Sequence, residues 1–126
     1  MVICLFGQRY RKGADLAEEA RLGGELLQEL QKLPGFVSYH GYTAADGEVL
    51  GVIRFETREA LEQWRNNPVH RAVWSRAIDF YEEFWIQNGE TYREYVWADG
   101  ARHDRDLIER FRADRAAGSY GATAAG

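Results

Sequence analysis

The stretch EQWRNNPVHRAVW, residues 62–74, combines side chains that could act on an aromatic molecule. The imidazole of His70 titrates near neutral pH, so it could accept a proton from a phenol or donate a hydrogen bond to the phenolate. Trp64 and Trp74 offer flat rings that could wall a pocket for a planar ligand. The alternative is structural, because His70 could instead pack on Trp74 or bond to a carbonyl, and tryptophans at helical spacing commonly fill a core.

Helical spacing adds two more candidates to this set. A helix that starts at Pro68 carries two apolar stripes, so one stripe can pack on a sheet while the other lines a cavity. One stripe consists of His70, Trp74, Ile78 and Tyr81, and the other of Val69, Val73 and Phe80. The sequence therefore predicts Ile78 as a substrate contact and Tyr81 as a catalytic hydrogen-bond donor.

Two predicted strands, 36–44 and 49–56, supply the remaining candidates. Both faces of the first strand carry aromatic residues, so alternation alone does not decide which face looks inward. His40 and Tyr42 therefore have two interpretations: a polar pair in the pocket, with Tyr42 as a donor and His40 as a substrate contact, or part of a dimer interface. On the second strand, Phe55 shares a face with Gly51 and is predicted to contact substrate.

The elements that position these residues follow the order β-α-β-β-α-α-β. Asp46-Gly47 is a hairpin turn, Thr57 and Asn67 are N-caps, and Gly23-Gly24 marks a kink or a close backbone approach. The expected elements are a strand at 1–10, a helix at 14–33, strands at 36–44 and 49–56, helices at 57–66 and 68–83, and a strand at 84–97. This is an α+β, ferredoxin-like split βαβ fold with a four-stranded antiparallel sheet.

The aromatic face of this sheet needs a cover, because the helices can cover only one side. We therefore expect a homodimer in which two sheets pack face to face. Residues 1–98 form the expected domain, and residues 99–126 form a tail with dense alternating charge. In that tail we expect a short helix that lies on the domain or on a dimer partner, followed by a disordered end, GSYGATAAG.

Composition excludes several classes of function. A net charge of -4 argues against nucleic acid, which requires a basic surface. The single Cys4 allows no internal disulfide or cysteine-based zinc cluster, and the spacing of the three histidines, His40, His70 and His103, predicts no metal site. No segment is long enough to span a membrane, and no glycine-rich phosphate loop is present. We expect a cytoplasmic protein.

Three segments in this order resemble the antibiotic biosynthesis monooxygenase family, whose members are small dimeric α+β barrels. They are LPGFVSY at 33–39, GVIRFETREALEQWRNNPVHRAVW at 51–74 and TYREY at 91–95. The resemblance covers residues 1–98. It implies one of three properties: a cofactor-independent oxygenase of phenolic or quinol-like aromatics, a haem-degrading oxygenase, or a protein without an assigned reaction.

Departures from the family patterns separate these alternatives. Anthrone-oxidising members carry polar and tryptophan side chains where this chain has Gly51 and Phe55. The haem-degrading members need an asparagine on the first strand, which VICLFGQRY lacks, and a histidine iron ligand at a position that falls near Trp74. Trp64 matches the tryptophan of that group, and His70 lies one helical turn before the ligand position.

The leading hypothesis is therefore a cofactor-independent monooxygenase acting on a small electron-rich aromatic. Deprotonation gives an anion that passes an electron to O₂, which requires only a base, a donor and a dry pocket. His70 is the predicted base, and Tyr42, His40 or Tyr81 the donor. One alternative is a non-catalytic dimer that binds a small hydrophobic ligand, and the second is a haem-binding oxygenase.

Overall fold

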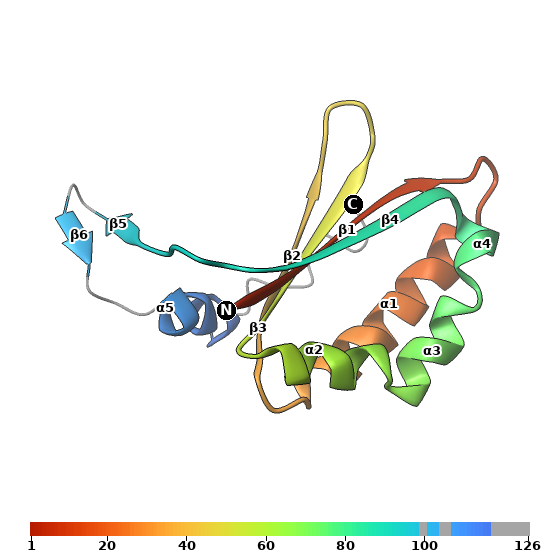
Figure 1. Cartoon of the computed structure of the whole chain (residues 1–126). Coiled ribbons are helices and arrows are strands. Elements are labelled where there is room, and N and C mark those ends of the chain that lie inside the picture. The colour runs from red at the N-terminus through yellow and green to blue at the C-terminus, as the bar shows by residue number, and fades with distance from the viewer. Residues whose placement is uncertain (99–100, 104–106, 117–126) are drawn as a thin grey trace.

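The computed structural model of the chain describes residues 1–98, 101–103 and 107–116 (Figure 1). Its main sheet is antiparallel, with the strand order β2-β3-β1-β4. The elements are β1 (Val2–Tyr10), α1 (Leu16–Gln31), β2 (Phe36–Thr43), β3 (Val49–Phe55), α2 (Arg58–Arg65), α3 (Pro68–Trp74), α4 (Ala77–Phe80), β4 (Tyr81–Glu90), β5 (Val96–Ala98), β6 (Ala101–His103) and α5 (Leu107–Ala116). The predicted ferredoxin-like fold and four-stranded sheet are confirmed.

Side-chain caps start the helices where the sequence predicts. Thr57 Oγ1 accepts from the backbone N–H of Ala60 at 3.2 Å. Asn67 Oδ1 accepts from the N–H groups of Val69 and His70, at 2.9 and 3.1 Å, and Pro68 occupies the first turn. Because Asn66 ends α2 and Asn67 caps α3, the two helices can approach the sheet at different angles.

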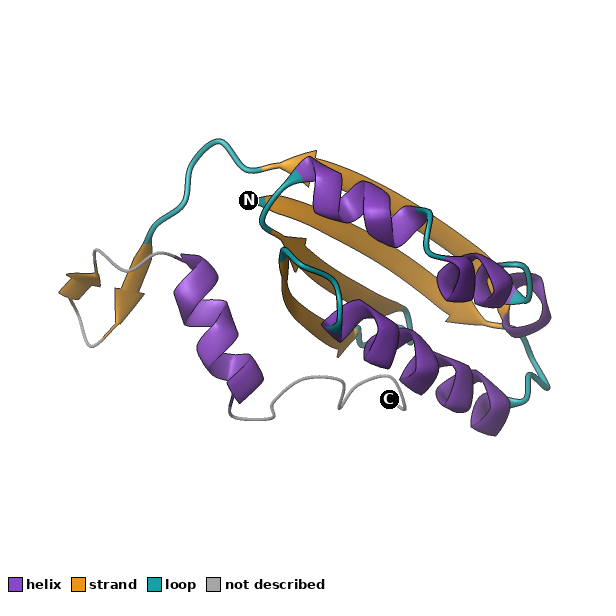
Figure 2. Cartoon of the chain, turned by 90° about the horizontal axis from the view of Figure 1, so that it is seen from below, coloured by secondary structure: helices purple, strands orange, loops and turns teal. Residues whose placement is uncertain are grey.

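The helices α1 to α4 form a layer over one side of the sheet (Figure 2). We call this side the inner face and the opposite side the outer face. Cys4, Ile53 and Tyr39 are cross-strand partners on the inner face, and Leu5, Val52 and His40 are the next row, on the outer face. None of the described helices is both long and apolar enough to cross a membrane.

Glycines on two strands let aromatic rings lie flat against the sheet. On the inner face, a Cβ at Gly51 would collide with the ring of Phe6. On the outer face, a Cβ at Gly7 would collide with the ring of Trp85, whose Nε1 donates to the carboxylate of Glu48 at 3.0 Å. The ring of Phe6 on β1 therefore lies across β3, and the ring of Trp85 on β4 lies across β1.

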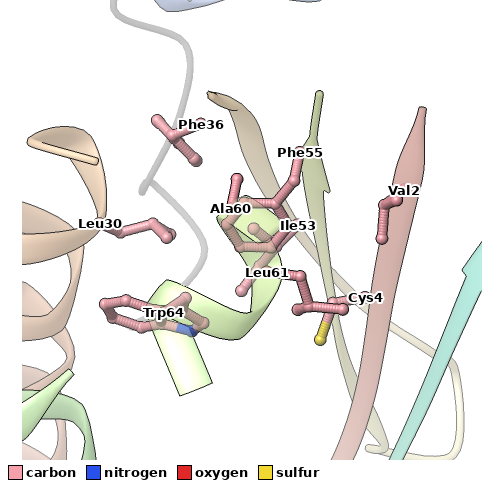
Figure 3. Close-up of a cluster of buried hydrophobic side chains, with 9 residues drawn as sticks. All are labelled: Val2, Cys4, Leu30, Phe36, Ile53, Phe55, Ala60, Leu61 and Trp64. Carbon is pink, nitrogen blue, oxygen red and sulfur yellow. The ribbon is translucent and has the colours of Figure 1, made fainter. Parts of the chain in front are cut away.

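A cluster of nine buried residues lies under α2, at the end of the sheet where β1 begins (Figure 3). Its members are Val2, Cys4, Leu30, Phe36, Ile53, Phe55, Ala60, Leu61 and Trp64. Phe55 has no exposed surface. This cluster is the hydrophobic core that fixes α1 and α2 on the sheet.

The predicted helix at 68–83 is shorter in the structure and is divided in two. Helix α3 ends at Trp74, a turn at Ser75 and Arg76 follows, and α4 is a single turn. The next residues belong to a strand of the sheet, because Tyr81 pairs with Tyr10 and Glu83 pairs with Arg9. Antiparallel pairing with β1 therefore overrides the helical pattern.

The predicted last strand at 84–97 also differs from the structure. Strand β4 begins earlier, at Tyr81, and ends at Glu90, which pairs with Val2. Thr91 then bonds through both its N–H and its hydroxyl to the carbonyl of Met1. Because β1 extends no further, β4 loses its partner, and the chain continues to the β5–β6 hairpin (Figure 1).

Helix α5 lies on β2. The ring of Phe111 contacts the guanidinium of Arg54 at 3.8 Å and lies 6.2 Å from the imidazole of His40. Arg112 forms a 2.6 Å ion pair with Glu56. The tail helix therefore rests on the chain's own sheet, while the predicted disorder of residues 118–126 lies outside the described residues.

Candidate functional site

A cavity of about 630 Å³ lies between the inner face of the sheet and the helical layer. Its floor is aromatic: the ring of Phe6 stacks with that of Tyr39 at 6.2 Å and with that of Phe84 at 5.9 Å. One wall is α1, which contributes Leu22 and Leu26. A cavity with flat rings and aliphatic walls suits a planar apolar ligand.

His70 lines this cavity from the first turn of α3, where the cap at Asn67 holds its backbone. Its ring stacks on that of Trp64, with centroids 4.3 Å apart. Its Nδ1 is buried and has no hydrogen-bond partner in the described part of the chain. Burial lowers the pKa of His70, and the backbone of Trp64 and Arg65 acts in the opposite direction. The imidazole is therefore held as a neutral base.

Both predicted tryptophans line the cavity, but in different ways. Trp64 is 5% exposed and belongs to the core cluster, so it fills the core and borders the cavity at once. Trp74 is 47% exposed, and its ring meets that of Phe84 edge-on at 4.7 Å. Trp74 therefore lies where the cavity meets solvent. His70 packs on a tryptophan ring, as its structural interpretation expects, but that ring belongs to Trp64 and not to Trp74.

Tyr81 also lines the cavity, and its hydroxyl donates to the carboxylate of Glu19 at 2.6 Å. Tyr10 approaches the other carboxylate oxygen at 3.4 Å. Glu19 is 8% exposed. Burial raises the pKa of Glu19, and burial together with the bond to Glu19 raises the pKa of Tyr81. His70 and the Glu19–Tyr81 pair are thus two polar features of the cavity, whose wall also includes Gln8, Tyr39, Arg65 and Asn88.

Sequence reasoning did not identify Glu19 as a site residue. An acidic residue near a helix start is favourable to the helix dipole, which is reason enough for its presence. The missed signal is its spacing, since Glu19 lies on the apolar stripe of α1 that includes Leu22, Leu26 and Leu30. A carboxylate on a buried stripe needs a polar partner, and the tyrosines provide it.

His40 and Tyr42 are not brought to the cavity. Both lie on the outer face, where His40 pairs with Val52 and Tyr42 is 55% exposed. The reason is a register shift between Phe36 and Ser38, which places Phe36 in the core although simple alternation puts it on the face of His40. The inner face of β2 presents Tyr39 instead.

Phe55 and Ile78 are likewise absent from the cavity wall. Phe55 shares a face with the cavity floor, but it lies under α2 in the core cluster. Ile78 is 72% exposed, because the turn that ends α3 takes it off the stripe of His70 and Trp74. Of the eight predicted site residues, His70, Tyr81, Trp64 and Trp74 line the cavity.

Cys4 lines the cavity as well, as a free thiol. Burial raises its pKa to about 11, so it is a thiol and not a thiolate at neutral pH. Among the described residues, no three His, Cys, Asp or Glu side chains are grouped to hold a metal ion. Besides Cys4, the ionisable side chains that line the cavity are Glu19, Tyr39, Arg65, His70 and Tyr81.

A helix-covered antiparallel sheet of this topology, with a cavity between its two layers, defines a ferredoxin-like α+β domain. The family model of the antibiotic biosynthesis monooxygenases matches residues 7–75, just over half of the chain. The chain belongs to this family. No curated protein matches it.

Solved structures share the fold at low sequence identity. Rv0793 from Mycobacterium tuberculosis is 22% identical, with a TM-score of 0.66, over 74% of this chain and 96% of that one. NE2512 from Nitrosomonas europaea, a protein of unknown function, is 12% identical, with a TM-score of 0.60, over 77% and 94%. SnoaB from Streptomyces nogalater, a cofactor-independent oxygenase, is 14% identical, with a TM-score of 0.58, over 74% and 93%.

Proposed function

We propose that this protein is a cofactor-independent monooxygenase acting on a small electron-rich aromatic molecule with phenol or quinol character. The observation that carries the proposal is the buried imidazole nitrogen of His70 at the wall of a cavity of about 630 Å³ with an aromatic floor. Membership of the monooxygenase family supports it, as does the shared fold of SnoaB, a cofactor-independent oxygenase.

The chemistry requires little from the protein. His70 takes the proton of a substrate hydroxyl, and the resulting anion carries electron density at a ring carbon. One electron passes to O₂, and the radical pair combines to form a carbon–oxygen bond. The peroxide takes up a proton, the carbon loses its hydrogen as a proton, and water leaves as the carbon becomes a carbonyl. An apolar cavity protects the anion and the peroxide from bulk water.

A role in ligand binding without catalysis is the second candidate. The stacking of His70 on Trp64 and the burial of its Nδ1 favour this alternative, because a packed ring has less freedom to reach a substrate atom. The same cavity would then hold a small hydrophobic ligand. The two candidates differ in whether O₂ is consumed.

We also propose a homodimer, as members of this family are typically dimeric. The outer face supports it, since Leu5 and Trp85 are only partly covered there. Helix α5 lies over β2, so the β1 and β4 side of the outer face is available to a second copy.

The test of the proposed reaction uses 2,6-dihydroxynaphthalene with chelator-treated protein and oxygen-18 gas. We expect oxygen uptake above the protein-free rate, one labelled atom in the hydroxynaphthoquinone product and the other in water. Oxygen uptake equal to the protein-free rate, with tight binding of the naphthalene, would favour the binding role.

A further inference from the structure

Glu19 and Tyr81 are a buried polar pair that the reaction above does not use. The Tyr81 hydroxyl donates to Glu19 Oε2 at 2.6 Å, the distance of a strong charge-assisted hydrogen bond. Among the described residues, no lysine or arginine pairs with Glu19, and its partners are the hydroxyls of Tyr10 and Tyr81. The carboxylate therefore depends on the tyrosines for its hydrogen bonds.

The pair lies at the opposite end of the cavity from His70. Glu19 is near the start of α1, whereas the ring on which His70 stacks, Trp64, packs near Leu30 towards the other end. Eleven residues of helix separate Glu19 from Leu30, a rise of about 16 Å. An ion pair of 3.0 Å between Glu18 and Arg76 places the turn after α3 beside the start of α1, whereas His70 is at the start of α3.

The direction of the hydrogen bond determines what Tyr81 can offer a ligand. A phenol has one proton to donate and two lone pairs to accept with. Because the proton of Tyr81 is committed to Glu19, its oxygen is left as an acceptor towards the cavity. A ligand hydroxyl can donate to that oxygen, whereas an ether or carbonyl oxygen would face it lone pair to lone pair.

We propose that Glu19 and Tyr81 form a recognition site that selects ligands carrying a hydrogen-bond donor, such as a hydroxyl group, at the end of the molecule remote from His70. Tyr81 is the residue that contacts the ligand, and Glu19 is the positioning residue that fixes the direction of its hydroxyl. The inference rests on the proposed function only for the phenolic class of ligand.

Protonation of Glu19 would reverse this selection. A carboxylic acid can donate to the Tyr81 oxygen, which frees the Tyr81 proton for an ether or a carbonyl. The other titratable groups facing Glu19 are Tyr10 and Tyr39, and burial raises the pKa of both, to about 12 for Tyr39. They stay neutral, so selectivity is expected to follow the titration of Glu19 alone.

The test compares the binding of 2,6-dihydroxynaphthalene and 6-methoxy-2-naphthol under anaerobic conditions, with naphthalene fluorescence as the readout. The two probes differ by one methyl group, which removes one donor. We expect the wild type to prefer the diol by about tenfold or more, the effect of one unmade hydrogen bond in a buried site. The preference should fall to within threefold in Tyr81→Phe, because this variant lacks the hydroxyl oxygen that accepts from the ligand.

Glu19→Gln should lose the preference too, because its amide can donate to Tyr81 and release the tyrosine proton. Glu25→Gln, an exposed carboxylate on the same helix, is the matched control and should keep it. In the wild type the preference should decrease as the pH falls through the pKa of Glu19, and in Glu19→Gln it should be independent of pH.

Equal affinities of the wild type for the two probes, or an unchanged preference in Tyr81→Phe, would overturn the proposal. The measurement needs no turnover. A protein that discriminates between the probes but consumes no O₂ would contradict the monooxygenase proposal and leave the recognition site intact. A protein that consumes O₂ but binds both probes equally would contradict the recognition site and leave the monooxygenase proposal intact.

Discussion

At the scale of single residues, the cavity holds two groups whose neutral forms are favoured by burial. Burial lowers the pKa of His70 and raises that of Glu19. An imidazole whose neutral form is favoured is suited to accepting a phenol proton near neutral pH, whereas Glu19 acts on a ligand only through the Tyr81 hydroxyl. Perturbed groups of this kind concentrate at functional sites, which agrees with their place on the cavity wall.

The raised pKa of Glu19 predicts a pH-dependent stability. Because its folded pKa lies above the unfolded value, the folded state binds the proton more tightly, and stability is lost as pH rises through the folded pKa. The Glu19→Gln variant has no carboxyl group to ionise at this position, so its stability does not fall in this way. The wild type should therefore lose stability relative to Glu19→Gln as the pH is raised from about 4 to 7, as measured by urea unfolding. A constant difference across this range would contradict the burial of an ionised carboxylate.

At the scale of elements, the break between α2 and α3 places the candidate base. Asn67 accepts from the N–H groups of Val69 and His70, so one side chain both starts the helix and holds the backbone of the base. Trp64 precedes the break and His70 follows it, yet their rings stack. A continuous helix would not bring residues six positions apart onto one face.

Removing this cap should affect both stability and ligand binding. Asn67→Ala is expected to cost about 1 kcal/mol of unfolding free energy, the usual value for an N-cap, and to weaken the binding of 2,6-dihydroxynaphthalene. Thr57→Ala removes the cap of α2 in the same way and is the matched control. It should lose similar stability but keep its affinity. Equal affinity losses in both variants would mean that α3 has no special role in the site.

The sequence predicts most elements, because local signals such as the Thr57 cap, the Asn67-Pro68 start and the Asp46-Gly47 turn coincide with the observed boundaries. The sequence-based prediction is wrong where pairing with a residue distant in sequence determines the boundary of an element. The pairing of Tyr81 with Tyr10 ends the helical region early. The strand that follows ends at Glu90 because β1 begins at Val2, which no local pattern shows.

The site is predicted in part for the same reason. His70, Tyr81, Trp64 and Trp74 lie on helices or at a helix–strand junction, where spacing along the chain indicates the face. His40 and Tyr42 lie on the outer face because the register shift at Phe36 changes the inward face of β2, so of their two interpretations only the dimer interface is left. Glu19 was missed because its partners, above all Tyr81, come from strands distant in sequence.

At the scale of the whole molecule, the sheet has two faces with different surroundings. The inner face forms the cavity with α1 to α4, and the outer face carries Trp85 across Gly7 and receives α5 over β2. The two faces use alternate residues of the same strands, so substitutions on one need not disturb the other.

This separation predicts how the protein assembles. Sedimentation velocity should show a dimer at micromolar concentration, and Leu5→Lys on the outer face should convert it to a monomer because a charge would be buried in the interface. Leu16→Lys, at an already exposed leucine of α1, is the control and should remain dimeric. A wild-type monomer at this concentration would rule out the proposed sheet-to-sheet dimer.

The role of His70 as the base of an oxygenation reaction can be measured with the variant His70→Phe. This variant keeps a ring to stack on Trp64 and removes the two imidazole nitrogens, so most of the packing is retained and its melting temperature should stay close to that of the wild type. Oxygen uptake with 2,6-dihydroxynaphthalene should fall by about a hundredfold or more, the usual contribution of a general base, while the affinity for the naphthalene ring changes little. Turnover within threefold of the wild type in a folded His70→Phe protein would contradict the account.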